Sequence, residues 1–338
     1  MKKRKAILSI TAALLIILIA AVISIKLLDG YSVKDRFKIP ADTTAVFSSP
    51  ARNDLILLIN GNINVLTLDG EITEYPTGHK VEYVSFNDDE ALFIDIESNL
   101  YRYSFKNMES FGPLLGNVCQ CDISLGSYAA VTKDGGLYVC GDNQYAQLGI
   151  KEEYIPEFRK IEYLSDVAAV DLNGDMSMAL TSSGDVYQCG LIYYDEDKKP
   201  VVFSKFKKIN ELSNVTSIYS HTGNIAVKGS GDVVYWNRKL NMDTAESMQF
   251  SDNKNISDYC SKKDMTAYSP GGIFSACMDS EGNVYLWGED ITEKNSLAKT
   301  TINLPVKIYD SKKADGIYSG YNVLYVKVRD EVLLIRRG

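Results

Sequence analysis

Histidine and tryptophan are the rarest residues of this 338-residue chain, with two of each, and proline occurs only eight times. His79 and His221 have no partners at the spacing of a metal site or a catalytic triad. We therefore interpret both as turn or surface residues and expect no metal, no cofactor and no catalytic residue. The low proline content and the lack of low-complexity blocks exclude a mainly disordered chain.

Long apolar runs are also absent, with one exception. Ala6–Ile25 contains twenty residues without a charge, and four basic residues at positions 2–5 precede it. Twenty apolar residues match a hydrocarbon core of about 30 Å, and the basic flank marks the cytoplasmic side. A cleaved signal peptide has a shorter apolar core, of about 7–15 residues, and a small-x-small cleavage site. The sequence therefore predicts a cytoplasmic tail (1–5) and an uncleaved single-pass anchor (6–25), with the bulk of the chain outside the cytoplasm.

Positive charge is scarce beyond the anchor. Residues 26–338 hold 32 basic and 44 acidic side chains, a net charge of −12. Such a domain is a poor nucleic-acid binder, because that affinity comes from neutralising phosphates. Cationic partners or metal ions suit it better, but a solvated acidic surface is the preferred interpretation. The acidic runs Asp88–Glu90 and Asp195–Asp197 lack a second carboxyl at a defined separation, so we interpret them as solvated loops and not as acid/base pairs.

Six cysteines in an exported domain suggest disulfides, but their positions argue against them. Cys121, Cys140, Cys189 and Cys277 stand where other repeats of the chain have Val, Ile, Leu or Trp. A buried thiol behaves as a small apolar side chain, so we expect free thiols at these positions. The redox state of the remaining two, Cys119 and Cys260, stays open.

A repeated motif organises the rest of the chain. In its best copy, Lys133–Gly149, a tight turn at Asp134-Gly135 leads into a short strand, and a polar loop follows whose side-chain amides can bond the backbone. The motif and its worn copies comprise Gly135, Tyr138, Gly141, Asn143, Gln147, Leu148, Gly149, Gly184, Tyr187, Gly190, Tyr235, Trp236, Gly282, Tyr285, Trp287 and Gly288.

The copies recur with a nearly constant period. The second residue of the strand stands at Tyr138, Tyr187, Tyr235, Tyr285 and Leu333, at intervals of 49, 48, 50 and 48 residues. Two earlier marks, Thr73 and Tyr101, stand only 28 and 37 residues before the next mark, so their units are either abbreviated or partly miscounted. Repeats of about 50 residues made of short strands are typical of β-propeller blades.

The Lys133–Gly149 segment resembles the repeat of the regulator of chromosome condensation family, a family of β-propellers. The family usually has Trp where Cys140 stands and Gly where Ala146 stands. The resemblance implies an interaction scaffold. The founding member of the family is a nucleotide-exchange factor for a nuclear small GTPase, a role that an exported, acidic domain does not suit. Exported propellers that dock one face on cell-wall-directed enzymes are more similar in setting.

We therefore expect an all-β fold: one propeller of six or seven four-stranded antiparallel blades, with seven preferred, over residues 45–338. One transmembrane helix and a stem at 26–44 precede it. The last repeat ends after its third strand. An early strand, Ala45–Ser48 or Leu55–Ile59, should complete that blade, because an open ring would expose strand edges.

One segment has some features of a calcium loop. Asp171–Ser177 alternates oxygen-bearing side chains, but its Gly is at the fourth position instead of the sixth, and Ser182 stands where a bidentate Glu is needed. We interpret the segment as a plain turn.

These features predict a membrane-anchored propeller at the cell envelope that binds an envelope or extracellular protein and is not an enzyme. Loop tyrosines are the expected contact residues, because exposed Tyr suits recognition surfaces. They are Tyr145, Tyr154, Tyr193 and Tyr194. The alternative is a carbohydrate-binding protein or an enzyme that uses the central channel, with a glycan as ligand. An enzyme should gather acids with shifted pKa values in one funnel, and an interaction face should expose an aromatic patch.

Overall fold

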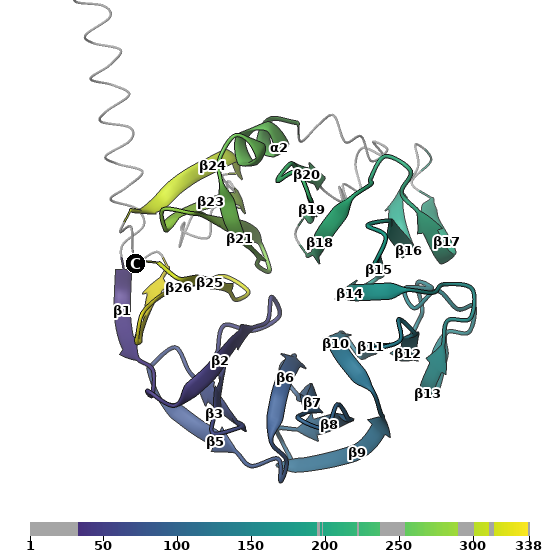
Figure 1. The fold of residues 1–338 in the computed structure, drawn as a ribbon, viewed down its shortest axis with the longest axis horizontal. Helices are drawn as coiled ribbons and strands as arrows, with labels where there is room; N and C mark the ends of the chain where they lie inside the picture. Colours follow the sequence, from purple (N-terminus) through teal and green to yellow (C-terminus); the bar gives the residue numbers. More distant parts are fainter. Residues whose placement is uncertain are drawn as a thin grey trace, which may run out of the picture.

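Seven antiparallel sheets stand in a ring around a central channel (Figure 1). In this computed structural model the described residues are 33–194, 197, 199–221, 223–236, 254–289, 301–310 and 314–336. The expected single propeller is confirmed, and it has seven blades. The predicted anchor, Ala6–Ile25, lies outside the described residues, and no helix within them is long and apolar enough to cross a membrane.

Each blade runs from an inner strand beside the channel to an outer element at the perimeter (Figure 1). Blade 1 contains β2 (Thr43–Ser48), β3 (Leu55–Ile59), β4 (Asn62–Leu66) and β5 (Ile72–Tyr75), and blade 2 contains β6 (Val81–Phe86), β7 (Glu90–Asp95), β8 (Leu100–Ser104) and β9 (Glu109–Leu115). Blade 3 contains β10 (Val118–Ser124), β11 (Ser127–Thr132), β12 (Leu137–Asp142) and β13 (Tyr154–Lys160), and blade 4 contains β14 (Val167–Asn173), β15 (Met176–Thr181), β16 (Val186–Tyr194) and β17 (Pro200–Lys208).

The other three blades complete the ring. Blade 5 contains β18 (Val215–Ser220), β19 (Asn224–Lys228) and β20 (Val233–Trp236), followed by the helix α2 (Lys254–Ser261). Blade 6 contains β21 (Met265–Pro270), β22 (Phe274–Asp279), β23 (Asn283–Glu289) and β24 (Thr301–Asp310), and blade 7 contains β25 (Gly316–Ser319), β26 (Leu324–Val328), β27 (Glu331–Ile335) and β1 (Val33–Lys38).

The strand β1 closes the ring. It pairs antiparallel with β27, from Val33 opposite Ile335 to Lys38 opposite Glu331, and so forms the outer strand of blade 7. The sequence predicted that Ala45–Ser48 or Leu55–Ile59 would complete the last blade. This prediction is wrong, because these segments lie in β2 and β3 of blade 1. The propeller thus begins within the stretch expected to be a stem. An outer strand buries little of its surface, so its mixed Val-Lys-Asp-Arg-Phe-Lys sequence carries no apolar pattern.

The repeat register is confirmed for blades 2, 3, 4, 6 and 7, where Tyr101, Tyr138, Tyr187, Tyr285 and Leu333 occupy one position of the third strand. Two marks need correction. In blade 5 the position belongs to Val234, because Val234 and not Tyr235 pairs with Ala226. In blade 1 it belongs to Asn64 in β4, while Thr73 lies in the outer strand β5.

The polar loop of the best repeat has the amide hydrogen bonds that were expected. The Asn143 amide donates to the carbonyl oxygens of Ile150 and Glu152 at 2.7 and 2.6 Å, and the Gln147 amide donates to Ser127 Oγ at 3.1 Å. Ser177 of blade 4 donates in turn to the Gln147 carbonyl at 2.6 Å. The motif residues therefore join blade 3 to blade 4.

A glycine of this motif is required by a close backbone approach. Gly141 has φ of +93°, and a Cβ there would lie 2.1 Å from the Gly126 carbonyl oxygen. Gly190 holds the equivalent place in blade 4, with the Asp175 carbonyl oxygen 2.3 Å from a Cβ. Any side chain would push the second and third strands of the blade apart.

The helix α2 borders blade 5 beyond β20, where other blades have a fourth strand. Its Ser257 and Ser261, one helical turn apart, accept hydrogen bonds from the backbone N–H groups of Tyr235 and Val233 at 3.0 and 2.9 Å. These two hydroxyls thus accept the hydrogen bonds of β20 N–H groups that would otherwise pair with an outer strand. This helix was not predicted from the sequence.

Apolar side chains fill the spaces between neighbouring blades and form the core. The six cysteines are free thiols, as expected for the four in apolar repeat positions. Three of those four, Cys121, Cys189 and Cys277, are buried, and so is Cys260. Cys140 is half-buried and Cys119 is exposed.

The closing strand gives a first test. A chain that starts at residue 45, the domain boundary expected from the sequence, lacks β1 and leaves the edge of β27 unpaired. Because each ladder hydrogen bond contributes about 1 kcal/mol net, we expect it to be less stable than a chain that starts at residue 33 by several kcal/mol. Thermal unfolding followed by circular dichroism measures the difference. Equal melting temperatures of the two chains would contradict the assignment of β1 to the ring.

Candidate functional site

The inner strands place seven equivalent side chains around the channel. One register position is filled, from blade 1 to blade 7, by Phe47, Ser85, Asp122, Asp171, Tyr219, Ser269 and Tyr318. The position alternates along each strand with buried residues that face neighbouring blades. Residues of this position therefore decide the chemistry of the channel.

A cavity of about 820 Å³ opens at the end of the channel where the inner strands turn into the second strands. All seven blades contribute to its wall. The lining includes five carboxylates and no Lys or Arg. It also includes six aromatic rings, those of Phe47, Tyr83, Phe86, Tyr219, Tyr268 and Tyr321. The candidate site is thus an acidic, aromatic funnel.

Hydrogen bonds between inner strands hold this wall together. Gln120 in β10 donates to the Val170 carbonyl in β14 at 2.8 Å and accepts from the Val170 N–H at 3.0 Å. Asp122 accepts from the Leu172 N–H at 2.7 Å. Each bond joins residues that are 50 positions apart in the sequence, which is about one repeat. Equivalent residues of successive repeats therefore contact each other directly between neighbouring blades.

Two acidic side chains of neighbouring blades face this cavity. Burial raises the pKa of Asp122 to about 6, although hydrogen bonds from the Leu172 N–H, the Ser85 hydroxyl and the Ile123 N–H oppose the shift. Burial also raises the pKa of Asp171 well above its usual range, and the nearby charge of Asp122 adds to the effect. Burial thus disfavours the charged form of both carboxyls, and a neighbouring positive charge would stabilise that form.

The Asp171–Ser177 segment, interpreted from the sequence as a plain turn, and His221, interpreted as a turn or surface residue, belong to the same wall. In Asp171–Ser177, Asp171 accepts from the Ser220 N–H at 3.1 Å, and the Asn173 amide donates to the His221 carbonyl at 2.6 Å. These are ties between blades 4 and 5, and within the described residues no group of three His, Cys, Asp or Glu side chains is arranged to hold a metal. His221 lines the cavity, and burial lowers its pKa to about 4, so it is neutral at pH 7.

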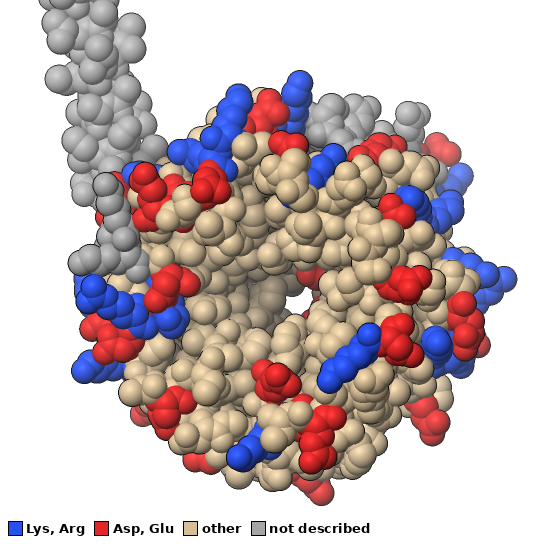
Figure 2. Space-filling model, in the orientation of Figure 1, with Lys and Arg blue, Asp and Glu red and all other residues tan. Residues whose placement is uncertain are grey.

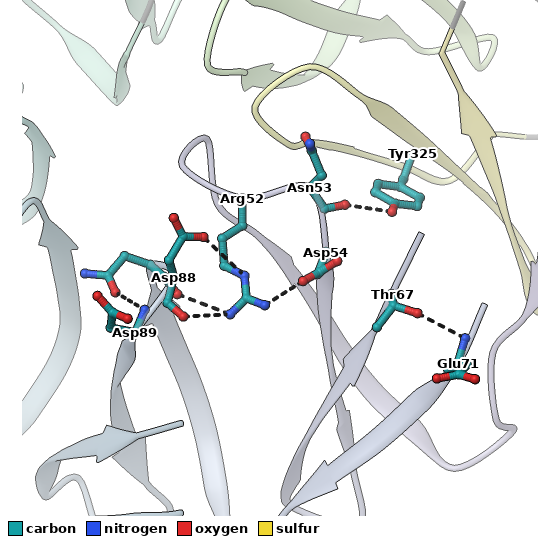
Figure 3. Close-up of polar contacts among 9 residues, drawn as sticks. Arg52, Asn53, Asp54, Thr67, Glu71, Asp88, Asp89 and Tyr325 are labelled. Atoms are coloured by element: carbon teal, nitrogen blue, oxygen red, sulfur yellow. Dashed lines mark hydrogen bonds and ion pairs between the residues drawn. The ribbon is translucent and has the colours of Figure 1, made fainter. Parts of the chain in front are cut away.

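The loop between β2 and β3 forms part of the mouth and is held from both sides (Figure 3). On the blade 7 side, the Tyr325 hydroxyl donates to the Asn53 carbonyl at 2.7 Å. On the blade 2 side, Arg52 donates to the Asp88 carbonyl at 3.3 Å and forms ion pairs with Asp54 and with Asp88, the latter at 3.7 Å. This loop is therefore a fixed part of the rim.

Charge differs between the centre and the perimeter of the ring. Figure 2 shows a face whose centre is hollowed and open, bounded mainly by side chains that are neither acidic nor basic, while most Lys and Arg side chains lie farther out. Arg52 and Arg102 do not line the cavity, but they pair with its lining residues Asp88 and Glu90. The interior of the funnel keeps its negative character.

Comparisons with known proteins follow the geometry. No protein-family model matches the chain. It is similar to the secretion-regulating guanine nucleotide exchange factor of Mus musculus, at 24% identity over 230 residues that make up 60% of this chain and 48% of that protein. The chain thus spans about half the length of the curated relative it matches.

Two solved structures show the same fold. Human WBSCR16 aligns with a TM-score of 0.66 at 13% identity, covering 90% of this chain and 89% of that one. Prp20p of Saccharomyces cerevisiae, the yeast RCC1, aligns with a TM-score of 0.65 at 14% identity, covering 88% and 84%. The fold is that of the regulator of chromosome condensation propellers. The resemblance seen in the motif residues is confirmed at this level.

Of the four predicted contact tyrosines, Tyr145 and Tyr154 do not line the cavity. Tyr145 in the β12–β13 loop is 45% exposed and Tyr154 at the start of β13 is 64% exposed. Tyr193 and Tyr194 end β16, and their side chains are outside what the structure describes. The prediction that these four residues contact a partner stays a prediction.

The exposed apolar residues of the mouth were not predicted from the sequence. Leu125 in the β10–β11 turn is 75% exposed, with φ of +45°, and Tyr321 in the β25–β26 turn is 48% exposed. Both line the cavity. An apolar residue in a two-residue turn, where Asn or Asp is usual, is the signal that could have identified Leu125.

The channel carboxyl gives a second test. Because the pKa of Asp122 is about 6 in the folded state and 3.8 ordinarily, the folded state binds the proton more tightly. Stability therefore falls as pH rises from about 4 to about 6. We expect Asp122→Asn to remove much of this pH dependence, because an amide does not titrate in this range. No gain in absolute stability is expected, because the Asn NH2 group cannot accept the hydrogen bond that Leu172 N–H donates to Asp122. Denaturant unfolding at several pH values measures the pH dependence.

Glu157, an exposed acid on β13, provides the matched control. Glu157→Gln should leave the pH dependence between 4 and 6 unchanged. If Asp122→Asn left it unchanged as well, the carboxyl would not carry the raised pKa.

Proposed function

We propose that this protein is a membrane-anchored propeller at the cell envelope that binds a protein partner outside the cytoplasm and catalyses no reaction itself. The observation that carries the binding role is the funnel at the channel mouth, with its aromatic rings and its carboxylates of one charge sign. Concave sites of this composition are the usual form of binding sites. The anchor Ala6–Ile25 and its basic flank support the membrane location.

The similar propellers support a protein partner. The yeast structure is described together with the binding of Prp20p to Gsp1p and histones, and another with Kap60 bound to yeast RCC1. An exchange-factor role for this chain would need a small GTPase on the same side of the membrane as the propeller. The proposed topology does not provide one, so we propose binding without exchange activity.

One observation favours the second candidate, a carbohydrate-binding protein or an enzyme of the channel. Asp122 and Asp171 have raised pKa values and share one funnel, as catalytic acids often do. However, Asp122 accepts three hydrogen bonds, from Leu172, Ile123 and Ser85, so it already serves as a structural tie between blades. We therefore rank protein binding first.

Cys119 makes the topology testable, because it is the one cysteine of the six that is exposed. We expect a membrane-impermeant maleimide to label the full-length protein on intact cells, and Cys119→Ser to abolish the labelling. Burial raises the pKa of this thiol, so the reaction should run at about pH 8.5, where more thiolate is present. Mass spectrometry of the labelled peptide is the readout. Labelling that occurs only after lysis would place the propeller inside and refute the proposed location.

Site-specific photo-cross-linking tests the partner. An aromatic photo-reactive residue at Tyr321, on the rim of the funnel, should cross-link one specific envelope protein in living cells, detected by mass spectrometry. The same residue at Tyr154 tests the contact predicted from the sequence. Met108, half-exposed in the β8–β9 turn, is the control and should give no specific product. Retained glycan without any cross-linked protein would favour the second candidate instead.

A further inference from the structure

The charge of the funnel is only partly balanced. Of its five carboxylates, Asp88 is paired with Arg52 and Glu90 with Arg102. Within the part of the chain that the structure describes, Asp89, Asp122 and Asp171 have no ion pair. Since the lining holds no Lys or Arg and its one histidine is neutral at pH 7, no positive charge in the cavity wall balances these carboxyls.

The uncompensated carboxyls stand next to aromatic rings. Asp122 and Asp171 occupy the same register position in adjacent blades, and Tyr219 occupies it in the next blade. The ring of Tyr219 lies 5.9 Å from that of Tyr268, which also lines the cavity. Carboxylates beside aromatic faces attract organic cations, because the ring quadrupole adds to the attraction of the charges.

Size and ligand geometry select the kind of cation. A volume of about 820 Å³ far exceeds what a bare ion fills and lies in the range of sites for organic groups. The described residues offer no set of three His, Cys, Asp or Glu side chains for a metal. A guanidinium or ammonium group on a flexible stem can reach carboxylates at this depth and place its stem against the rings.

We propose that this funnel receives the side chain of an arginine or lysine of the partner protein, with Asp122 and Asp171 as the charge partners and Tyr219 as the aromatic contact. The inference rests on the proposed protein-binding function and names the chemistry of its contact. Charge complementarity argues for this occupant. Leu125 and Tyr321 supply apolar surface at the rim, where the rest of a docked segment would lie.

A peptide titration tests the site directly. The probe is a fluorescent peptide of alternating Arg and Gly, added to the purified full-length protein in detergent, and fluorescence polarisation reports binding. We expect binding that weakens as salt rises, and at least about a tenfold loss of affinity in the double variant Asp122→Asn/Asp171→Asn. The same peptide with Glu for Arg should not bind.

Matched variants separate a local site from the acidity of the whole domain. Glu71→Gln/Glu157→Gln removes two exposed acidic charges outside the cavity and should change the affinity less than about twofold. Tyr219→Phe keeps the ring and should bind as the parent does, whereas Tyr219→Leu should bind more weakly. Thermal unfolding checks that each variant is folded. An equal loss in the two double variants, or none in either, would overturn the proposal.

Two further outcomes distinguish this inference from the proposed function. If the Tyr321 cross-link to the partner forms equally well in the Asp122/Asp171 double variant, protein binding stands and the cationic contact is refuted. If the Arg peptide binds in the expected way but no partner is ever cross-linked, the site stands and the proposed function falls. Spermidine that binds more tightly than the peptide would assign the funnel to free amines and overturn the partner side chain as occupant.

Discussion

The antiparallel pairing of β1 with β27 turns seven sheets into a ring, and the channel exists only because that ring is closed. A row of blades without this contact would leave the edge of β27 unpaired, and every inner strand could splay. A second set of contacts, at the mouth of the channel, also holds blade 1 to its neighbours. The Asn53 loop is bonded to blade 7, and the neighbouring Arg52 is bonded to blade 2, so the first blade is fixed to both neighbours.

Inner-strand side chains extend this constraint around the channel. Gln120 and Asp122 bond the backbone of β14, Asp171 bonds β18, and Ser269 bonds the Ser319 N–H of β25. A serine or an amide does this without charge, whereas Asp122 and Asp171 do it with carboxyls whose pKa values are raised. A neutral residue would be the less costly tie. That acids stand here, in adjacent blades, is what distinguishes this wall from a purely structural one.

The fold was predictable from the sequence wherever a residue has no substitute. Gly141 and Gly190 are required because a Cβ would meet a backbone oxygen, so this position keeps the repeat visible from blade 3 to blade 4. Asn143 and Gln147 are required by the loop they bond and mark only the best copy. The strand β1 was not predictable, because an outer strand needs no apolar alternation. The helix α2 was missed for a related reason: two serines one turn apart suffice to satisfy β20, and such a pair is not a distinctive pattern.

The funnel could not be predicted as a whole, because its residues are about 50 positions apart and meet only after the ring closes. Asp122 and Asp171 read singly as ordinary strand or turn acids. Their equivalence becomes visible only when the blades are aligned strand by strand.

The distribution of side chains at this level of the channel also gives it a direction. The two carboxyls stand on the side of blades 3 and 4, and large rings stand in blades 1, 5 and 7, at Phe47, Tyr219 and Tyr318. A ring of seven identical residues would give a symmetric field and no preferred orientation for a ligand. Here a cation is attracted toward one wall, while aromatic surface on either side of the acids limits how its stem can lie. The irregularity of the repeats, which makes the sequence harder to align, is therefore what gives the channel this direction, and the proposed recognition of a partner depends on it.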